Sequence, residues 1–125
     1  MQNMGDYQVL AHVETPEFSM LLLSLGGNDH VAPHYHDHSK QLYAVLDGVV
    51  EVTLGNRTFY LRPYGTTHIE RQTIHNVRPV DGPALVLSIC TPPLNVEDQH
   101  LVAQSPARAD IRSDPALSGC LQQAA

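Results

Sequence analysis

The sequence is short of basic residues, cysteines and long apolar runs, and each shortage argues against a class of function. Seven Lys and Arg residues stand against thirteen Asp and Glu, so the net charge of −6 offers no basic surface to a nucleic acid. Two cysteines do not form a disulfide framework. The longest apolar stretch, Met20 to Leu25, is broken by Ser24 and is far too short to span a bilayer. We therefore expect a cytoplasmic protein that binds neither nucleic acid nor a membrane.

Several familiar catalytic motifs are also missing. The chain has no glycine-rich loop for phosphate, no Gly-x-Ser-x-Gly elbow and no Cys-x2-Cys metal site. Histidine, in contrast, is abundant, with eight residues against seven Lys and Arg. Because histidine is the commonest metal ligand and titrates near neutrality, this balance favours a metal or acid–base site.

Short β-rich segments separated by Gly and Pro predict an all-β fold, and no helical period appears before residue 94. At 125 residues the chain fits one domain, which we expect over residues 1–104 and a C-terminal tail or short helix over 105–125. Asp47-Gly48 between two β-rich runs predicts a hairpin turn, and Asn95 can cap one helical turn. The unalternating apolar run 18–25 predicts a strand that is covered on both faces.

The candidate ligands are concentrated in one short segment. His34 and His36 lie two residues apart, so in an extended backbone both imidazoles point to the same face, with Cα atoms roughly 6.5 to 7 Å apart. Two imidazoles at this distance can reach one ion. If Gln41 points into the interior, strand alternation sends Tyr43 the same way.

The string His34-x-His36-x4-Gln41-x6-Gly48 resembles the first motif of the cupin superfamily, in which two histidines, a third ligand that is usually Glu, and a turn glycine recur at this spacing. The resemblance covers residues 20–93. It implies a double-stranded β-helix, a small jelly-roll-like barrel, with a metal bound inside by the two histidines and Gln41.

Two placements of the second cupin motif compete for the fourth ligand. Pro63-x-Gly65-x2-His68 matches the usual string literally and would make His68 the ligand. The other placement selects His75, although it lacks the usual prolines and glycine. The spacing of 39 residues from His36 and the fit of the flanking strands favour His75.

Gln41 is the departure from the family pattern, and it points to Lewis-acid chemistry. Three imidazoles and one carboxamide carry no charge to offset a divalent ion, which then polarises a carbonyl, hydroxyl or carboxylate more strongly. Nitrogen and oxygen ligands suit Zn, Ni, Mn or Fe. Among cupins, the Gln variant is similar to that of enzymes that convert unsaturated uronates to their keto forms.

The resulting interpretation is a metal-dependent isomerase, lyase or cyclase acting on a small oxygenated and preferably anionic substrate, such as a sugar acid or a polyketide-like carbonyl compound. Tyr43 is the predicted proton-transferring residue. Two alternatives remain open, an iron-dependent dioxygenase and a non-catalytic module that binds or senses a small ligand. The outward apolar positions Leu42, Ala44 and Leu46 predict a homodimer.

Overall fold

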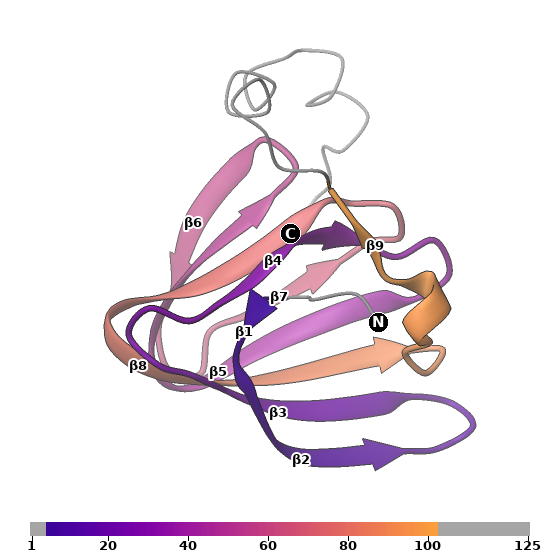
Figure 1. Ribbon diagram of the computed structural model, residues 1–125, viewed down its shortest axis with the longest axis horizontal. Coiled ribbons are helices and arrows are strands. Elements are labelled where there is room, and N and C mark those ends of the chain that lie inside the picture. Colours follow the sequence, from indigo (N-terminus) through magenta and orange to yellow (C-terminus); the bar gives the residue numbers. More distant parts are fainter. Residues whose placement is uncertain (1–4, 103–125) are drawn as a thin grey trace.

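The structure, a computed structural model, describes residues 5–102 and folds them almost entirely as β-strands (Figure 1). Asn95 accepts a hydrogen bond from the amide of Glu97, as its predicted capping role requires. The predicted tail or helix over 105–125 lies outside the described residues. No helix in residues 5–102 is long and apolar enough to cross a membrane.

The elements are β1 (Gly5–Asp6), β2 (Gln8–Glu14), β3 (Ser19–Leu25), β4 (His30–Tyr35), β5 (Lys40–Leu54), β6 (Arg57–Leu61), β7 (Thr66–Ile69), β8 (His75–Thr91), the 3-10 turn η1 (Val96–Asp98) and β9 (His100–Leu101).

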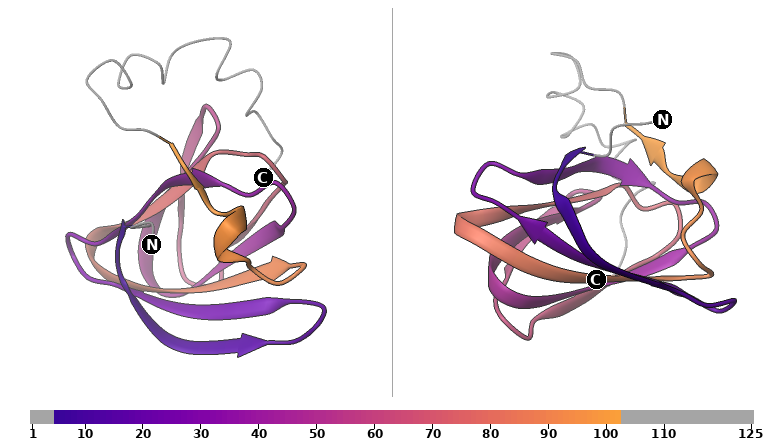
Figure 2. Two further views of the ribbon diagram at one scale, coloured as in Figure 1. Left: turned by 45° about the vertical axis from the view of Figure 1, so that its right-hand side comes forward. Right: turned by 60° about the horizontal axis from the view of Figure 1, so that its bottom comes forward.

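Two long strands, β5 and β8, form the frame of the barrel. They pair with each other antiparallel along nearly their whole length, from Lys40 opposite Thr91 to Leu54 opposite His75. Both strands bend midway, so the curled sheet has two halves that face each other (Figures 1 and 2). The lower half has the strand order β2-β3-β8-β5-β7, and the upper half combines β1, β4 and β6 with the other ends of β8 and β5.

The hairpin predicted at Asp47-Gly48 is wrong, because β5 continues through it. Gly48 has φ 78°, and a Cβ there would lie 2.4 Å from the carbonyl oxygen of Pro83, so only glycine fits. Asp81 and Gly82 supply the matching bend in β8, with φ values of 60° and 132°. Both a hairpin and a bend need positive φ, and the dipeptide signal does not distinguish between them.

Within residues 5–102 only one face of β3 is fully buried, although the sequence predicts a strand covered on both faces. Leu23 and Leu25 are buried in the interior, with 4% and 0% of their surface exposed. The alternate residues Met20 and Leu22 point outward and stay partly exposed. The strand therefore has one buried face and one apolar outer face that no other part of residues 5–102 covers (Figure 1).

The interior between the two halves holds an apolar core and a group of buried polar residues. Val45, Val52, Val77 and Val86 are fully buried in that core. Because alternate residues of a strand share a face, the same strands also send polar side chains inward. These buried polar residues are Ser19, His34, His36, Ser39, Gln41, Thr67, Thr73, His75, Ser88 and Asp98.

Candidate metal centre

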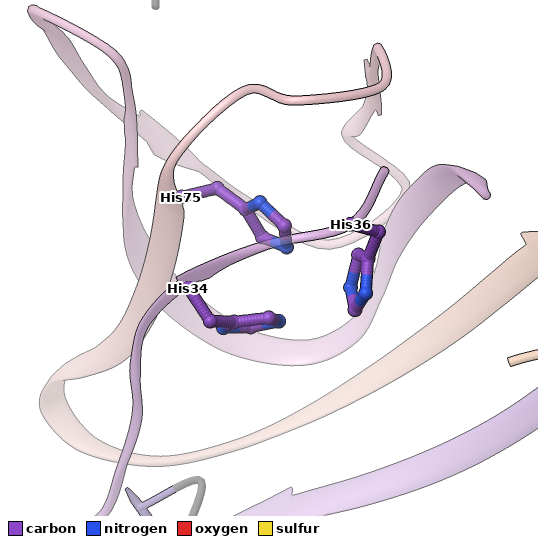
Figure 3. Close-up of side chains that lie close together, drawn as sticks. All are labelled: His34, His36 and His75. Carbon is purple, nitrogen blue, oxygen red and sulfur yellow. The ribbon is translucent and has the colours of Figure 1, made fainter. Parts of the chain in front are cut away.

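Three histidines from two strands and a loop converge inside the barrel (Figure 3). His34 on β4 lies directly opposite His75 on β8 in the antiparallel pairing, so both side chains leave the same face of the sheet. His36 is the first residue after β4, and its side chain points to the same face. Their ligand nitrogens all lie within 4.8 Å of one another, and 3%, 2% and 0% of His34, His36 and His75 are exposed.

Each imidazole is held by a backbone carbonyl that fixes its tautomer. The Nδ1 atoms of His34, His36 and His75 lie 2.7, 2.9 and 2.8 Å from the carbonyl oxygens of Ala32, Asp98 and Thr73. A carbonyl only accepts, so the proton of each neutral ring sits on Nδ1 and the lone pair on Nε2. The Nε2 atoms of His36 and His75 are buried and have no hydrogen-bond partner. Histidines that bind metal ions usually donate their other ring N–H in this way, so the three rings are oriented as metal ligands are.

Burial keeps the three rings neutral. It lowers the pKa of His34 to about 4, with a further lowering from His36. Burial also lowers the pKa of His75 well below its ordinary value, and His34 and His36 add to the effect. The pKa of His36 is lowered by burial as well, although its contacts with Asp98 and Gln41 oppose the shift. All three nitrogen donors are therefore available at neutral pH.

The depressed pKa of His34 predicts acid sensitivity of the metal-free protein. An unfolded histidine takes up its proton near pH 6.5, whereas folded His34 does so only near pH 4. The unfolded state thus binds more protons between these values, and stability is lost as the pH falls from 6.5 to 4. The loss from His34 is on the order of 3 kcal/mol. Denaturant unfolding of chelator-treated protein as a function of pH measures this loss. His34→Gln should flatten the dependence of stability on pH, whereas His12→Gln, at an exposed site, should leave it unchanged.

Gln41 adds an oxygen donor next to the histidines. Its Nε2 donates a hydrogen bond to Ser88 Oγ at 2.7 Å, which orients the amide, and its Oε1 is buried without a partner. The side chain lies close enough to His36 to raise the pKa of that ring. Three Nε2 lone pairs and an unused amide oxygen are donors that suit a divalent transition metal, so the residues present fit such an ion.

His68, the competing fourth ligand, does not reach the cluster. It lies on β7 opposite Leu42, about half of its side chain is exposed, and its Nε2 is 3.4 Å from a Glu70 oxygen. His75 occupies the position beside His34 instead. The strand pairing, and not the local string, decides which histidine faces the interior.

Tyr43 points inward as predicted and is 1% exposed. Its ring centroid lies 6.1 Å from that of His75, in an edge-to-face arrangement. Burial raises the pKa of the Tyr43 phenol far above its ordinary value, and the neighbouring Cys90 and Tyr7 raise it further. The phenol is therefore neutral at physiological pH and, with no cation beside it, donates a hydrogen bond more readily than a proton.

Two further residues of the site gave no recognisable signal in the sequence. Ser88 orients Gln41 from β8, 47 residues away. Asp98 in η1 holds the loop that carries His36: its carbonyl binds the ring Nδ1, and its two carboxylate oxygens accept the amides of Asp37 and His38 at 2.8 and 3.0 Å. Oxygen or nitrogen atoms of Asp37, Asp98 and His100 also lie within 4.8 Å of one another, but both Asp98 oxygens accept hydrogen bonds from these amides. Contacts this distant in sequence have no local pattern.

Replacing Asp98 should weaken metal binding without removing any direct ligand. Asp98→Asn places an amide NH2 against one of the two backbone N–H groups, which loosens the loop at His36. We expect the metal dissociation constant to rise by about 10-fold or more, as outer-shell changes commonly produce. Titration with a chromophoric chelator measures it. Glu51→Gln, which breaks the surface pair between Glu51 and Arg78, is the control that should leave the affinity unchanged. Equal affinities in both variants would contradict the role of Asp98.

Comparison with known proteins places this geometry in a family context. The family described as "Cupin domain" matches residues 21–90. A cupin 2 domain-containing protein from Halorhodospira halophila has a similar structure, with a TM-score of 0.68 and 20% identity, covering 89% of this chain and 77% of that one. KdgF from Halomonas sp. gives a TM-score of 0.65 and 20% identity, over 74% of this chain and 89% of that one. No curated protein sequence matches the chain.

A third structural neighbour identifies the barrel type. An uncharacterized conserved protein with a double-stranded β-helix domain, from Klebsiella pneumoniae, is 17% identical with a TM-score of 0.67 and covers 83% of this chain and 89% of that one. At these identities the similarity establishes the fold alone. The predicted all-β double-stranded β-helix is confirmed.

Proposed function

Because the chain belongs to the cupin domain family and gathers three buried histidines inside its barrel, we propose that it is a metal-dependent enzyme. The proposed reaction is of the isomerase, lyase or cyclase type, and its substrate is a small oxygenated molecule. His34, His36, Gln41 and His75 are the proposed ligands of one divalent ion, Zn, Ni, Mn or Fe. When bound, such an ion supplies Lewis-acid polarisation of a substrate oxygen.

The observation that carries this proposal is the neutrality of the donor set. The three rings are kept uncharged by burial, and Gln41 brings an amide oxygen with no charge. Among the buried polar residues of the described chain, Asp98 is the only acid, and backbone amides occupy both of its oxygens. None of the four proposed ligands carries a charge that would balance a divalent ion, so an anionic oxygen ligand would bind favourably.

Neutral hydroxyl groups line the inner face next to Gln41. Tyr43 lies between Thr67 on β7 and Ser88 on β8 in the strand pairing, and all three are buried. Thr67 Oγ1 has no hydrogen-bond partner. We propose that Tyr43, whose phenol a cation bound nearby would make more acidic, donates its proton to a substrate oxygen, and that Thr67 positions the substrate by a hydrogen bond.

Sugar acids are the first substrates to test, since the Gln ligand is similar to that of uronate-ketonising cupins. The similarity to KdgF supports this choice only at the level of the fold. The experiment compares zinc- and iron-loaded protein on an unsaturated uronate, with product formation and oxygen consumption recorded together. We expect turnover in both metal forms without oxygen uptake, and Tyr43→Phe should lower turnover while metal content stays the same.

Two results would overturn this assignment in different directions. Oxygen uptake with the iron form and none with zinc would identify a dioxygenase. A small molecule that copurifies tightly and is recovered unchanged, with no turnover in any metal form, would identify a binding or sensing module. Loss of metal on mutating Tyr43, with no separate effect on turnover, would count against the proton-transfer role.

A further inference from the structure

The loop 70–74, which joins β7 to β8, lies against the segment that carries one of the proposed metal ligands. The backbone amide of Gln72 donates a hydrogen bond to the carbonyl of His36 at 2.6 Å. Beside it, Nε of Arg71 donates a hydrogen bond to the carbonyl of His38 at 2.8 Å. Arg71 is therefore attached directly to the chain that positions the His36 imidazole.

Further contacts hold the backbone of this loop. Gln72 has φ 65°, a left-handed conformation that non-glycine residues adopt at a cost in free energy. Its side-chain Nε2 lies 3.4 Å from Asp37 Oδ1, and the carbonyl of the next residue, Thr73, accepts a hydrogen bond from Nδ1 of His75 at 2.8 Å. Backbone strain of this kind persists only where surrounding contacts enforce it, and ligand-binding segments often contain it. The loop therefore fixes the base of the Arg71 side chain relative to the imidazoles.

The guanidinium of Arg71 keeps most of its hydrogen-bond donors for a ligand. Of the five N–H donors of a guanidinium, the one on Nε is bound to the His38 carbonyl. The side chain is exposed, and the ion pairs found among residues 5–102 do not include it. Because a carbonyl does not neutralise a charge, Arg71 presents a positive charge and two Nη groups in the planar fork that carboxylates bind.

Charged side chains near Arg71 have partners, in contrast to Arg71 itself. Lys40 Nζ lies 3.7 Å from Glu70 Oε1, so these two charges offset each other. Asp37 Oδ2 lies 3.2 Å from Nε2 of His100. Since the whole chain carries a net charge of −6, an anion approaches it against a repulsive field and needs a local positive charge to bind. Arg71 supplies such a charge next to the proposed ligands.

We propose that Arg71 is a specificity-determining residue that binds the carboxylate of a sugar acid, while the rest of the molecule extends toward the imidazoles. This role of Arg71 rests on the metal-dependent function proposed above. The carboxylate accepts two parallel hydrogen bonds from the guanidinium. Because Arg71 contacts His38 and not the ligand His36 itself, it selects acids whose carboxylate lies several bonds from the reacting oxygen. A short acid such as oxalate binds at the proposed metal ligands without reaching Arg71.

Calorimetric titration of the zinc-loaded, full-length protein with galacturonate and with oxalate tests the proposal. Arg71→Gln should raise the dissociation constant for galacturonate about 10-fold, the effect of losing one charge-assisted contact at an exposed site. The dissociation constant for oxalate should stay the same. A glutamine amide can still donate a hydrogen bond to the His38 carbonyl, so this substitution removes the charge and keeps the contact between the loops.

Two matched variants identify the cause of the loss. Arg71→Lys keeps the charge but not the planar fork, so its affinity for galacturonate should lie between those of the wild type and Arg71→Gln. Arg62→Gln removes an exposed positive charge from the turn before β7 and should change neither dissociation constant. Competition with a chelator, measured for each variant, should give the metal affinity of the wild type.

The metal and the two anions give separate outcomes. A zinc-loaded wild type that binds oxalate but not galacturonate, or that binds galacturonate as tightly after Arg71→Gln, would overturn the role of Arg71 and leave the metal site intact. Equal losses for both anions, or a loss of metal affinity in Arg71→Gln, would show that Arg71 only holds the loop. A wild type that takes up no metal would overturn the proposed function, and the role of Arg71 with it.

Discussion

His75→Ala should abolish stable metal binding, whereas His68→Ala should leave it unchanged. His75 is fully buried, opposite His34 in the strand pairing, and its Nε2 has no hydrogen-bond partner. Removing it deletes one of three imidazoles that are held ready by backbone carbonyls. The loss should exceed the roughly 10- to 100-fold effect that outer-shell substitutions cause. Metal content per chain after dialysis, followed by competition with a chelator, measures it.

The His68 variant separates ligand loss from general damage to the barrel. Its side chain is half exposed and lies near Glu70, so its removal costs little. Thermal unfolding of the metal-free forms shows whether His75→Ala is still folded. A folded His75→Ala protein that binds metal as tightly as the wild type, or an equal loss in His68→Ala, would contradict the proposed ligand set.

Gln41→Glu should bind the metal more tightly but anions more weakly. At a separation of about 4 Å and an effective dielectric constant of about 20, one added negative charge is worth about 4 kcal/mol in Coulomb energy. Allowing for partial screening, we expect the affinity of metal-loaded protein for oxalate to fall on the order of 100-fold and the metal affinity to rise about 10-fold. Calorimetric titration at pH 8, where the carboxylate is ionised, measures both.

Ser88→Ala is the matched control for this substitution. It removes the hydrogen bond that orients the Gln41 amide but changes no charge. The anion affinity of Ser88→Ala should therefore stay within a few-fold of the wild type, while its metal affinity falls. If Gln41→Glu leaves oxalate binding unchanged, the neutrality of the four proposed ligands does not determine anion affinity, and the Lewis-acid interpretation loses its main support.

Alternation along strands made the inner face predictable from the sequence. Because side chains of a strand point alternately to opposite faces, the spacing of His34 and His36 and the inward direction of Gln41 and Tyr43 followed from local geometry. The structure buries all four. Local geometry alone did not favour His75 over His68, because that prediction depended on how the flanking strands fit the family pattern.

Features set by the path of the chain in three dimensions could not be predicted. Asp47-Gly48 signals positive φ, but the neighbouring Pro83 carbonyl makes it a bend in a continuous strand. Asp98 reaches His36 across 62 residues and Ser88 reaches Gln41 across 47. The exposed outer side of β3 depends on which strands lie over it. None of these relations leaves a periodic pattern in the sequence.

Anomalous diffraction from crystals of zinc-loaded protein, recorded at the zinc absorption edge, tests the central claim most directly. The neutral donor set predicts one strong peak per chain, within bonding distance of Nε2 of His34, His36 and His75 and of Oε1 of Gln41. No peak at this position, or a peak at His68 or at the cluster of Asp37, Asp98 and His100 instead, would contradict the proposed metal centre.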